Sequence, residues 1–95
     1  MSTRTVQVDV TEDDIYHGVR GDPCCCPVAR ALARAFPAVQ VEVAPLVLRI
    51  GGQRITAPGE VVGFVSAFDD FFLPDPGPFS FGLQWDEAAG RWAAA

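Results

Sequence analysis

The chain has 95 residues, and we expect residues 1–95 to form one small α/β domain with a modest core. Its net charge is −5 and its seven basic residues are all arginine, so nucleic acid is an unfavourable partner, because nucleic-acid affinity depends largely on cationic contacts. Apolar residues make up 49% of the chain, which argues against disorder, yet no apolar run approaches the roughly 18 residues of a membrane span.

The cysteines and the N-terminal residues predict a cytoplasmic location. Met1–Thr5 lacks the basic and apolar regions of a signal peptide. The three cysteines are an odd number, so they cannot all pair within the chain, and cytoplasmic thiols stay reduced.

The first part of the chain predicts a strand and two helices. Val6, Val8 and Val10 alternate with polar residues, which is typical of a strand with one apolar face. Thr11 begins a short helix as a variant capping box with Asp14, and Gly18 ends it.

A second helix is expected from Pro27, which suits a first helical turn, to Pro37, which ends it. Arg30 and Arg34 fall on its solvent side. Its buried stripe is expected to consist of Val28, Leu32, Ala35 and Phe36.

Three strands are expected next. A turn at Ala44-Pro45 would pair Val43 with Leu46. Gly51-Gly52 is the preferred composition of a two-residue hairpin, and it places Arg49 opposite Arg54.

The last third predicts a helix from Pro58 and a strand, with a short final strand after it. The helix would bury Val61, Phe64, Val65, Phe68 and Phe72, while Asp69 and Asp70 lie at its C-terminal end, the unfavourable end for negative charge. The strand carries Phe79, Phe81, Leu83 and Trp85 on one face, and the final strand carries Trp92.

The element order is therefore β-α-α-β-β-β-α-β with a further short strand. Strands with one apolar face need a cover, and the two longer helices have matching apolar stripes. We expect an α+β fold, a two-layer sandwich in which a mainly antiparallel sheet of four or five strands is covered by two helices. A terminal strand left as an unprotected edge would allow a homodimer.

All three cysteines stand together as Cys24, Cys25 and Cys26. Cys26 occupies the N-cap of the second predicted helix, where the helix dipole and unpaired N–H groups can lower the pKa of a thiol. His17 is the only histidine and could serve as its base. The alternative, which we favour, is a structural cap, because cysteine also packs as a small hydrophobe.

A zinc site would use His17, Cys24, Cys25 and Cys26. Zinc ligands are normally spaced two to four residues apart, so three consecutive cysteines are awkward, and we expect no cofactor and no metal.

Two further groups of residues are candidates for binding. Arg49 and Arg54 lie opposite each other on the polar face of the hairpin, with Glu42 diagonal to Arg49, as either a solvated face or a site for an acidic segment or a small anion such as a nucleotide. Trp92 falls on the face opposite Trp85 if Trp85 pairs with Arg91, and an exposed Trp92 would be an anchor for a partner. A loop one residue longer would instead bring the two tryptophans together.

Four short pieces of the chain occur together in a recognisable order: Asp14-Ile15 with Gly18, Cys26-Pro27-Val28-Ala29 with Ala31-Leu32, Ala67-Phe68-Asp69, and Pro78-Phe79-Ser80-Phe81. This pattern resembles a group of small uncharacterised proteins of actinobacteria and their bacteriophages, over roughly residues 6–83. The resemblance implies a phage or prophage origin, and thus the host cytoplasm, and it singles out Cys26 among the cysteines.

These observations lead to three hypotheses. The leading one is a non-enzymatic phage-type accessory protein that binds a host protein, because no catalytic constellation is assembled in the sequence. The second is a thiol-dependent enzyme or redox module that uses Cys26 and His17. The third is a small anion- or nucleotide-binding protein that uses Arg49 and Arg54.

Overall fold

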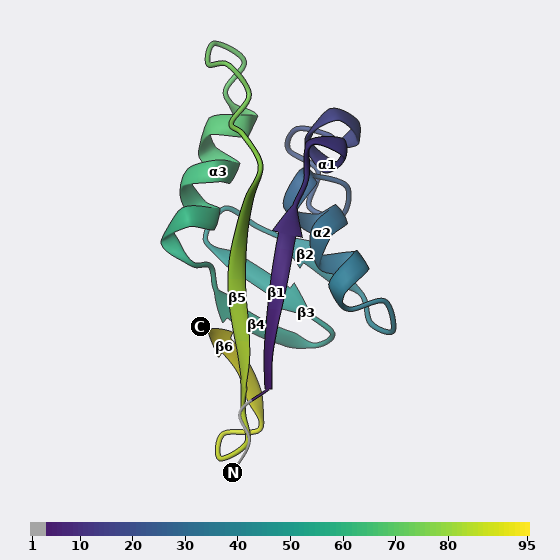
Figure 1. The fold of residues 1–95 in the computed structure, drawn as a ribbon, viewed down its shortest axis with the longest axis vertical. Coiled ribbons are helices and arrows are strands. Elements are labelled where there is room, and N and C mark those ends of the chain that lie inside the picture. The colour runs from purple at the N-terminus through teal and green to yellow at the C-terminus, as the bar shows by residue number, and fades with distance from the viewer. Residues whose placement is uncertain (1–3) are drawn as a thin grey trace.

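The computed structural model describes residues 4–95 and follows the predicted order of elements, including the short final strand (Figure 1). The segment Met1–Thr5, which was predicted to lack the features of a signal peptide, lies largely outside the described residues. The elements are β1 (Arg4–Val10), α1 (Glu12–His17), α2 (Pro27–Ala35), β2 (Val41–Val43), β3 (Val47–Ile50), β4 (Gln53–Thr56), α3 (Gly59–Asp69), β5 (Phe79–Asp86) and β6 (Arg91–Ala94).

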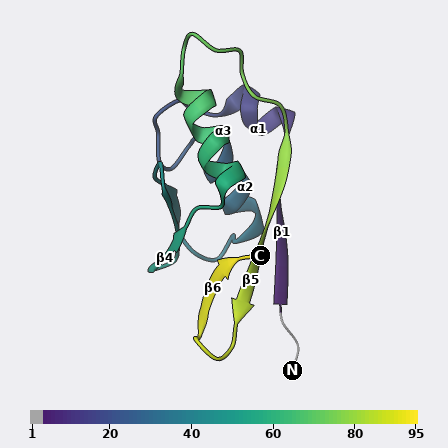
Figure 2. The ribbon, with the colours of Figure 1, turned by 90° about the vertical axis from the view of Figure 1, so that its left-hand side faces the viewer.

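The strands form two antiparallel sheets, which corrects the prediction of one sheet of four or five strands. One sheet has the order β1-β5-β6 and the other β2-β3-β4. Figures 1 and 2 show the two sheets facing each other, with α2 and α3 along the two open sides between them. The α+β class is confirmed.

The apolar faces of both sheets and of the two longer helices supply one core. This confirms the alternation predicted for the strands, because each inward residue is separated from the next by an outward one. The side chains buried most completely are Val8, Val10, Val28, Leu32, Leu48, Val61 and Leu83.

Hydrogen bonds from side chains, instead of backbone hydrogen bonds between strands, join the two sheets where β4 meets β6. The Gln53 amide donates to the Trp92 carbonyl oxygen at 2.7 Å and accepts from the Trp92 N–H at 3.0 Å. Arg91 donates to the Arg54 carbonyl oxygen at 2.8 Å. These bonds occupy the outer edge of β6, so a homodimer through an edge strand stays a prediction for β1.

The registers of the two hairpins differ in how well they were predicted. Ile50 pairs with Gln53 and Arg49 with Arg54, as expected, and Gly51 has the positive φ of 63° that a two-residue turn requires at its first position. The preceding turn is Pro45-Leu46 instead of Ala44-Pro45, so Val43 pairs with Leu48. Leu46 consequently lies in the turn and is 65% exposed.

The capping box of α1 is confirmed and extends into an ion pair with a buried carboxylate. Thr11 Oγ1 accepts from the Asp14 N–H at 3.2 Å, and Asp14 Oδ2 accepts from the Thr11 N–H at 2.9 Å. The Asp14 side chain is fully buried, and Arg34 donates to both of its carboxylate oxygens, at 3.0 and 2.7 Å. Arg34 was expected on the solvent side of α2; it is half exposed, but its guanidinium turns inward to this carboxylate.

Gly18 allows α1 and α2 to approach closely. A Cβ atom at this position would lie 2.5 Å from Cδ of Pro27 and 2.7 Å from the carbonyl oxygen of Asp14, well inside van der Waals contact. Since Pro27 is buried as the first residue of α2, the ring cannot move away without disturbing the core.

Candidate functional site

Cys26 is a buried helix cap. Its sulfur accepts a hydrogen bond from the Ala29 N–H at 3.4 Å, and the residue is 6% exposed. Burial raises the pKa of the Cys26 thiol; the N–H groups of Ala29 and Val28 lower it by less, and the carboxylates of Asp69 and Asp22 raise it further. The thiol is therefore protonated at neutral pH, which is unfavourable for a nucleophile.

Cys24 and Cys25 lie apart from Cys26, on the surface of the loop before α2. Their N–H groups donate to Oδ1 of Asp22 at 2.9 and 3.1 Å. They share a shallow depression of about 520 Å³ with His17, whereas Cys26 lines a separate cavity of about 160 Å³. His17 is instead held by Asp13, whose carboxylate lies 3.1 Å from Nδ1.

The structure thus does not assemble the thiol–imidazole pair or the zinc set that the sequence allowed. Cys26 is buried under α2 while its two neighbours face solvent, so the three sulfurs do not converge. Within residues 4–95, no group of three or more His, Cys, Asp or Glu side chains is placed to hold a metal ion.

Thiol labelling of the reduced, folded protein tests this description. We expect Cys24 and Cys25 to react with iodoacetamide in the native state and Cys26 to react only after denaturation, because exposure and thiolate formation both control the rate. Mass spectrometry of the labelled peptides reads each site. Rapid native labelling of Cys26 would contradict the buried cap.

Arg49 and Arg54 lie opposite each other, as predicted, on the outward face of β3 and β4. Glu42 is directly opposite Arg49 in β2 instead of diagonal, because the preceding turn is one residue later than expected. A cavity of about 240 Å³ lies between these three side chains and Pro23, Ala44 and Val47.

Trp92 is not the exposed anchor that the sequence allowed. The β5–β6 loop has the longer of the two lengths considered, so Trp85 pairs with Trp92. The two rings lie edge to face with centroids 5.4 Å apart, and Phe36 packs on the other side at 5.1 Å. The half-buried Trp92 therefore belongs to the scaffold.

The largest exposed aromatic surface lies in the loop after α3. We call residues Phe71, Phe72 and Leu73 the aromatic tip; they are 81%, 96% and 50% exposed. Phe72 was predicted in the buried stripe of the last helix, and that prediction is wrong because α3 ends at Asp69. In Figure 1 this loop extends beyond the end of α3, away from the sheets.

The base of this loop is tied to the body of the protein by Arg20. Its Nε donates to the Phe68 carbonyl oxygen at 2.8 Å, and its terminal nitrogen pairs with the Asp75 carboxylate. The guanidinium also lies 5.2 Å from the centre of the Phe71 ring, within the range of a cation–π contact. Asp70 Oδ1 accepts from the Phe72 N–H at 2.9 Å, which orders the chain inside the tip.

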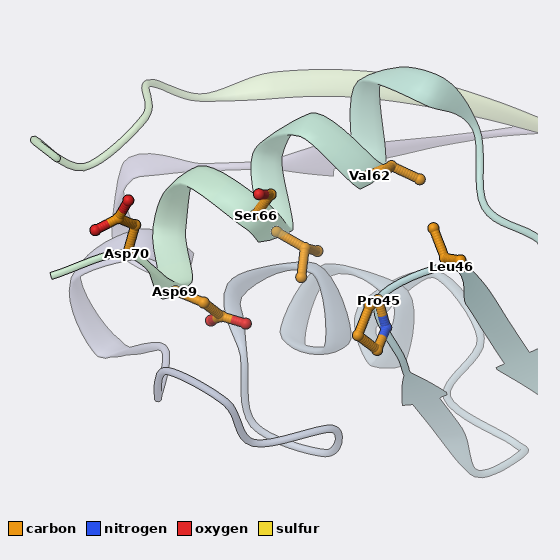
Figure 3. Close-up of a pocket in the computed structure, with 7 residues that line it drawn as sticks. Pro45, Leu46, Val62, Ser66, Asp69 and Asp70 are labelled. Atoms are coloured by element: carbon orange, nitrogen blue, oxygen red, sulfur yellow. The ribbon is translucent and has the colours of Figure 1, made fainter. Parts of the chain in front are cut away.

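An apolar groove runs beside the loop, between α3 and the β2–β3 turn (Figure 3). Val62 and Leu46 face each other across it, and Asp69 and Asp70 lie at its end, where α3 stops. The groove has a volume of about 420 Å³ and is lined by Pro45, Leu46, Val62, Val65, Ser66, Asp69 and Asp70. Among the described residues, no cation lies within 4 Å of either carboxylate.

Sequence reasoning missed this surface, although two signals marked it. Asp69 and Asp70 are unfavourable at the C-terminus of a helix, which indicated either a helix end or a functional use. Pro74 also disfavours a helical conformation at Leu73, so a helix has to end close to Phe72, where a buried stripe is least secure.

Comparison of the chain with protein-family models, with curated proteins and with solved structures finds no match. None of the helices within residues 4–95 has the length and apolar character needed to cross a bilayer.

Proposed function

We propose that the protein is a non-enzymatic, phage-type accessory protein that acts in the host cytoplasm by binding a host protein. The observation that carries this proposal is the aromatic tip: three consecutive large apolar residues, with Phe72 96% exposed, on a loop ordered by side-chain bonds. Aromatic side chains are enriched at the centres of protein interfaces, whereas isolated apolar residues are ordinary at surfaces.

The chemistry of the tip and the groove defines the partner. Leu46, Val62 and Val65 offer an apolar floor, and Asp69 and Asp70 place two carboxylates at its end. Each of these aspartates uses one oxygen within the protein, for the N–H of Gly21 or of Phe72, and keeps the other for a partner. This arrangement suits a partner segment with an apolar side chain followed closely by Lys or Arg.

The anchoring of the loop favours binding over a merely flexible connection. Arg20 contacts the loop through Phe71 and Asp75 and fixes it to the end of α3. A surface held in its bound conformation loses less conformational entropy when a partner binds.

The thiol-enzyme alternative lacks support of this kind, because Cys26 is buried and His17 lines a different cavity.

Peptide display against the immobilised full-length protein tests the proposal. We expect enrichment of peptides with an apolar residue next to Lys or Arg, and weaker binding at higher salt. Phe72→Ser is expected to lower the affinity of the selected peptides by at least about tenfold, since truncating an aromatic hot spot costs about 2 kcal/mol or more.

Tyr16→Ser is the matched control. Tyr16 is 84% exposed, but it lies on α1, away from the groove, so its loss should leave peptide affinity unchanged. Both variants should melt like the parent protein, because neither side chain is packed in the core. Selected peptides that bind Phe72→Ser as tightly as the parent would refute the proposal.

A further inference from the structure

A second surface lies on a different part of the molecule, the outward face of the β2–β3–β4 sheet. It consists of Arg49 and Arg54 with Glu42 beside them, around the cavity of about 240 Å³. The groove beside the aromatic tip uses none of these residues, so the two surfaces can be tested separately.

The register brings the two arginine side chains close together. A two-residue turn is closed by a hydrogen-bonded pair, here Ile50 and Gln53, so the next pair, Arg49 and Arg54, is of the non-hydrogen-bonded kind. In such pairs the side chains approach most closely. The backbone agrees, because the Arg54 carbonyl oxygen points away from β3 and accepts from Arg91.

Arg91, on β6, contacts the backbone of this pair but does not line the cavity. Its guanidinium lies 2.8 Å from the Arg54 carbonyl oxygen, although its donor there is used by the backbone. The two cations of Arg49 and Arg54 on adjacent strands raise the local potential even though the chain as a whole carries a net charge of −5.

The two arginines also lack the carboxylate partners that three of the other five arginines have among the described residues. Arg20, Arg30 and Arg34 each form an ion pair. Neither Arg49 nor Arg54 has a carboxylate within 4 Å among the described residues, although Glu42 is opposite Arg49 in the neighbouring strand. Like charges directly opposite each other destabilise a sheet, and the single Glu42 carboxylate can compensate the charge of only one of the two arginines.

We propose that Arg49 and Arg54 form a site for a doubly charged phosphate oxyanion, either inorganic phosphate or a phosphate monoester. Two guanidinium forks on one cavity can donate to several oxygens of a tetrahedral anion at once, whereas a carboxylate has only two oxygens to offer. Glu42 opposes the anion by repulsion and therefore limits its affinity.

Thermal melting at constant ionic strength tests this site, with inorganic phosphate as the probe and chloride or acetate as the comparison. We expect 20 mM phosphate to raise the Tm of the parent protein by about 3–5 °C, with a smaller effect of acetate. Arg49→Gln and Arg54→Gln should each abolish the phosphate-dependent rise, and Glu42→Gln should increase it.

The comparison is made within each variant, with and without phosphate, so a change in basal stability does not obscure it. Without phosphate, Arg54→Gln should melt above the parent because one of two opposed charges is gone. Arg4→Gln, on β1, is the matched control and should keep the full rise. The site would be overturned by any of three results: no phosphate-specific rise in the parent, an equal rise with acetate, or an undiminished rise in Arg54→Gln. If the site holds, the same melting experiment with phosphate monoesters shows whether free or ester-bound phosphate binds better.

Discussion

Asp14→Ala is expected to destabilise the protein by about 2 kcal/mol, less than for a fully buried ion pair, because the half-exposed Arg34 guanidinium can be hydrated when its partner is lost. The substitution removes the carboxylate that caps α1 and leaves the guanidinium of Arg34 without its partner. It also removes the carboxylate 3.5 Å from the buried Arg30 Nε, which has no hydrogen bond of its own, although Arg30 keeps its surface ion pair with Asp13. Chemical denaturation of the parent and the variant measures the difference.

The pH dependence of stability provides a second measurement of the same carboxylate. Burial raises the pKa of Asp14, but hydrogen bonds from Arg34 and Thr11 outweigh burial and lower it from 3.8 to about 2. Because the folded-state pKa is lower than the unfolded one, the carboxylate stabilises the fold fully above about pH 4. This stabilisation is lost as the pH falls from about 4 to about 2, and Asp14→Asn should lose less stability over that range than the parent.

Asp13→Asn is the control for both measurements. Asp13 is the neighbouring carboxylate, it is 71% exposed, and its ion pairs with His17 and Arg30 are at the surface, where such pairs contribute little. We expect Asp13→Asn to lie within about 0.5 kcal/mol of the parent. An Asp14→Ala variant of equal stability would show that the pair of Asp14 with Arg34 is not a structural requirement.

Gly18→Ala is expected to cost about 3 kcal/mol, at the upper end of the range for overpacking, because a single methyl group has no space. The added carbon would lie 2.5 and 2.6 Å from two atoms of the Pro27 ring and 2.7 Å from the Asp14 carbonyl oxygen. All three atoms belong to a ring or to backbone, so relief requires α1 and α2 to move apart. Urea denaturation at neutral pH measures the loss.

Gly63→Ala is the matched control for that substitution. Gly63 lies within α3 with no atom within 4 Å of an added Cβ, so alanine should stabilise the protein by about 1 kcal/mol through helix propensity. The double variant Gly18→Ala, Pro27→Ala should recover part of the loss, since its ring contacts are removed. A Gly18→Ala variant as stable as the parent would contradict the close approach of the two helices.

The contacts of these residues account for the first two pieces of the four-piece sequence pattern, those from Asp14 to Gly18 and from Cys26 to Leu32. Asp14 caps α1 and pairs with Arg34, Gly18 admits the Pro27 ring, and Cys26 caps α2. Asp14 and Gly18 join α1 to α2, Cys26 caps α2, and none of the three is left exposed as a reactive group. We therefore infer that Asp14, Gly18, Cys26 and Pro27 serve the scaffold, while the two proposed binding surfaces lie elsewhere, on the loop after α3 and on the β2–β3–β4 sheet.

Most local structure was predictable because it depends on neighbours in the chain. The capping box at Thr11, the proline at the start of α2 and the Gly51-Gly52 hairpin all follow from residues a few positions apart. The candidate site was only partly predictable: the opposition of Arg49 and Arg54 followed from the hairpin, but the exposure of Phe72 depended on where α3 ends.

By itself, the sequence determined the order of the elements, the inward faces of the strands and the cap at Cys26, since hydrophobic periodicity and capping chemistry are local properties. Only the tertiary structure decided that the strands form two sheets, because β1 pairs with β5, which lies far away in the chain, instead of with the three central strands. It also decided that Arg34 reaches a buried carboxylate and that the aromatic tip stays in solvent, because burial depends on what packs against a side chain after folding.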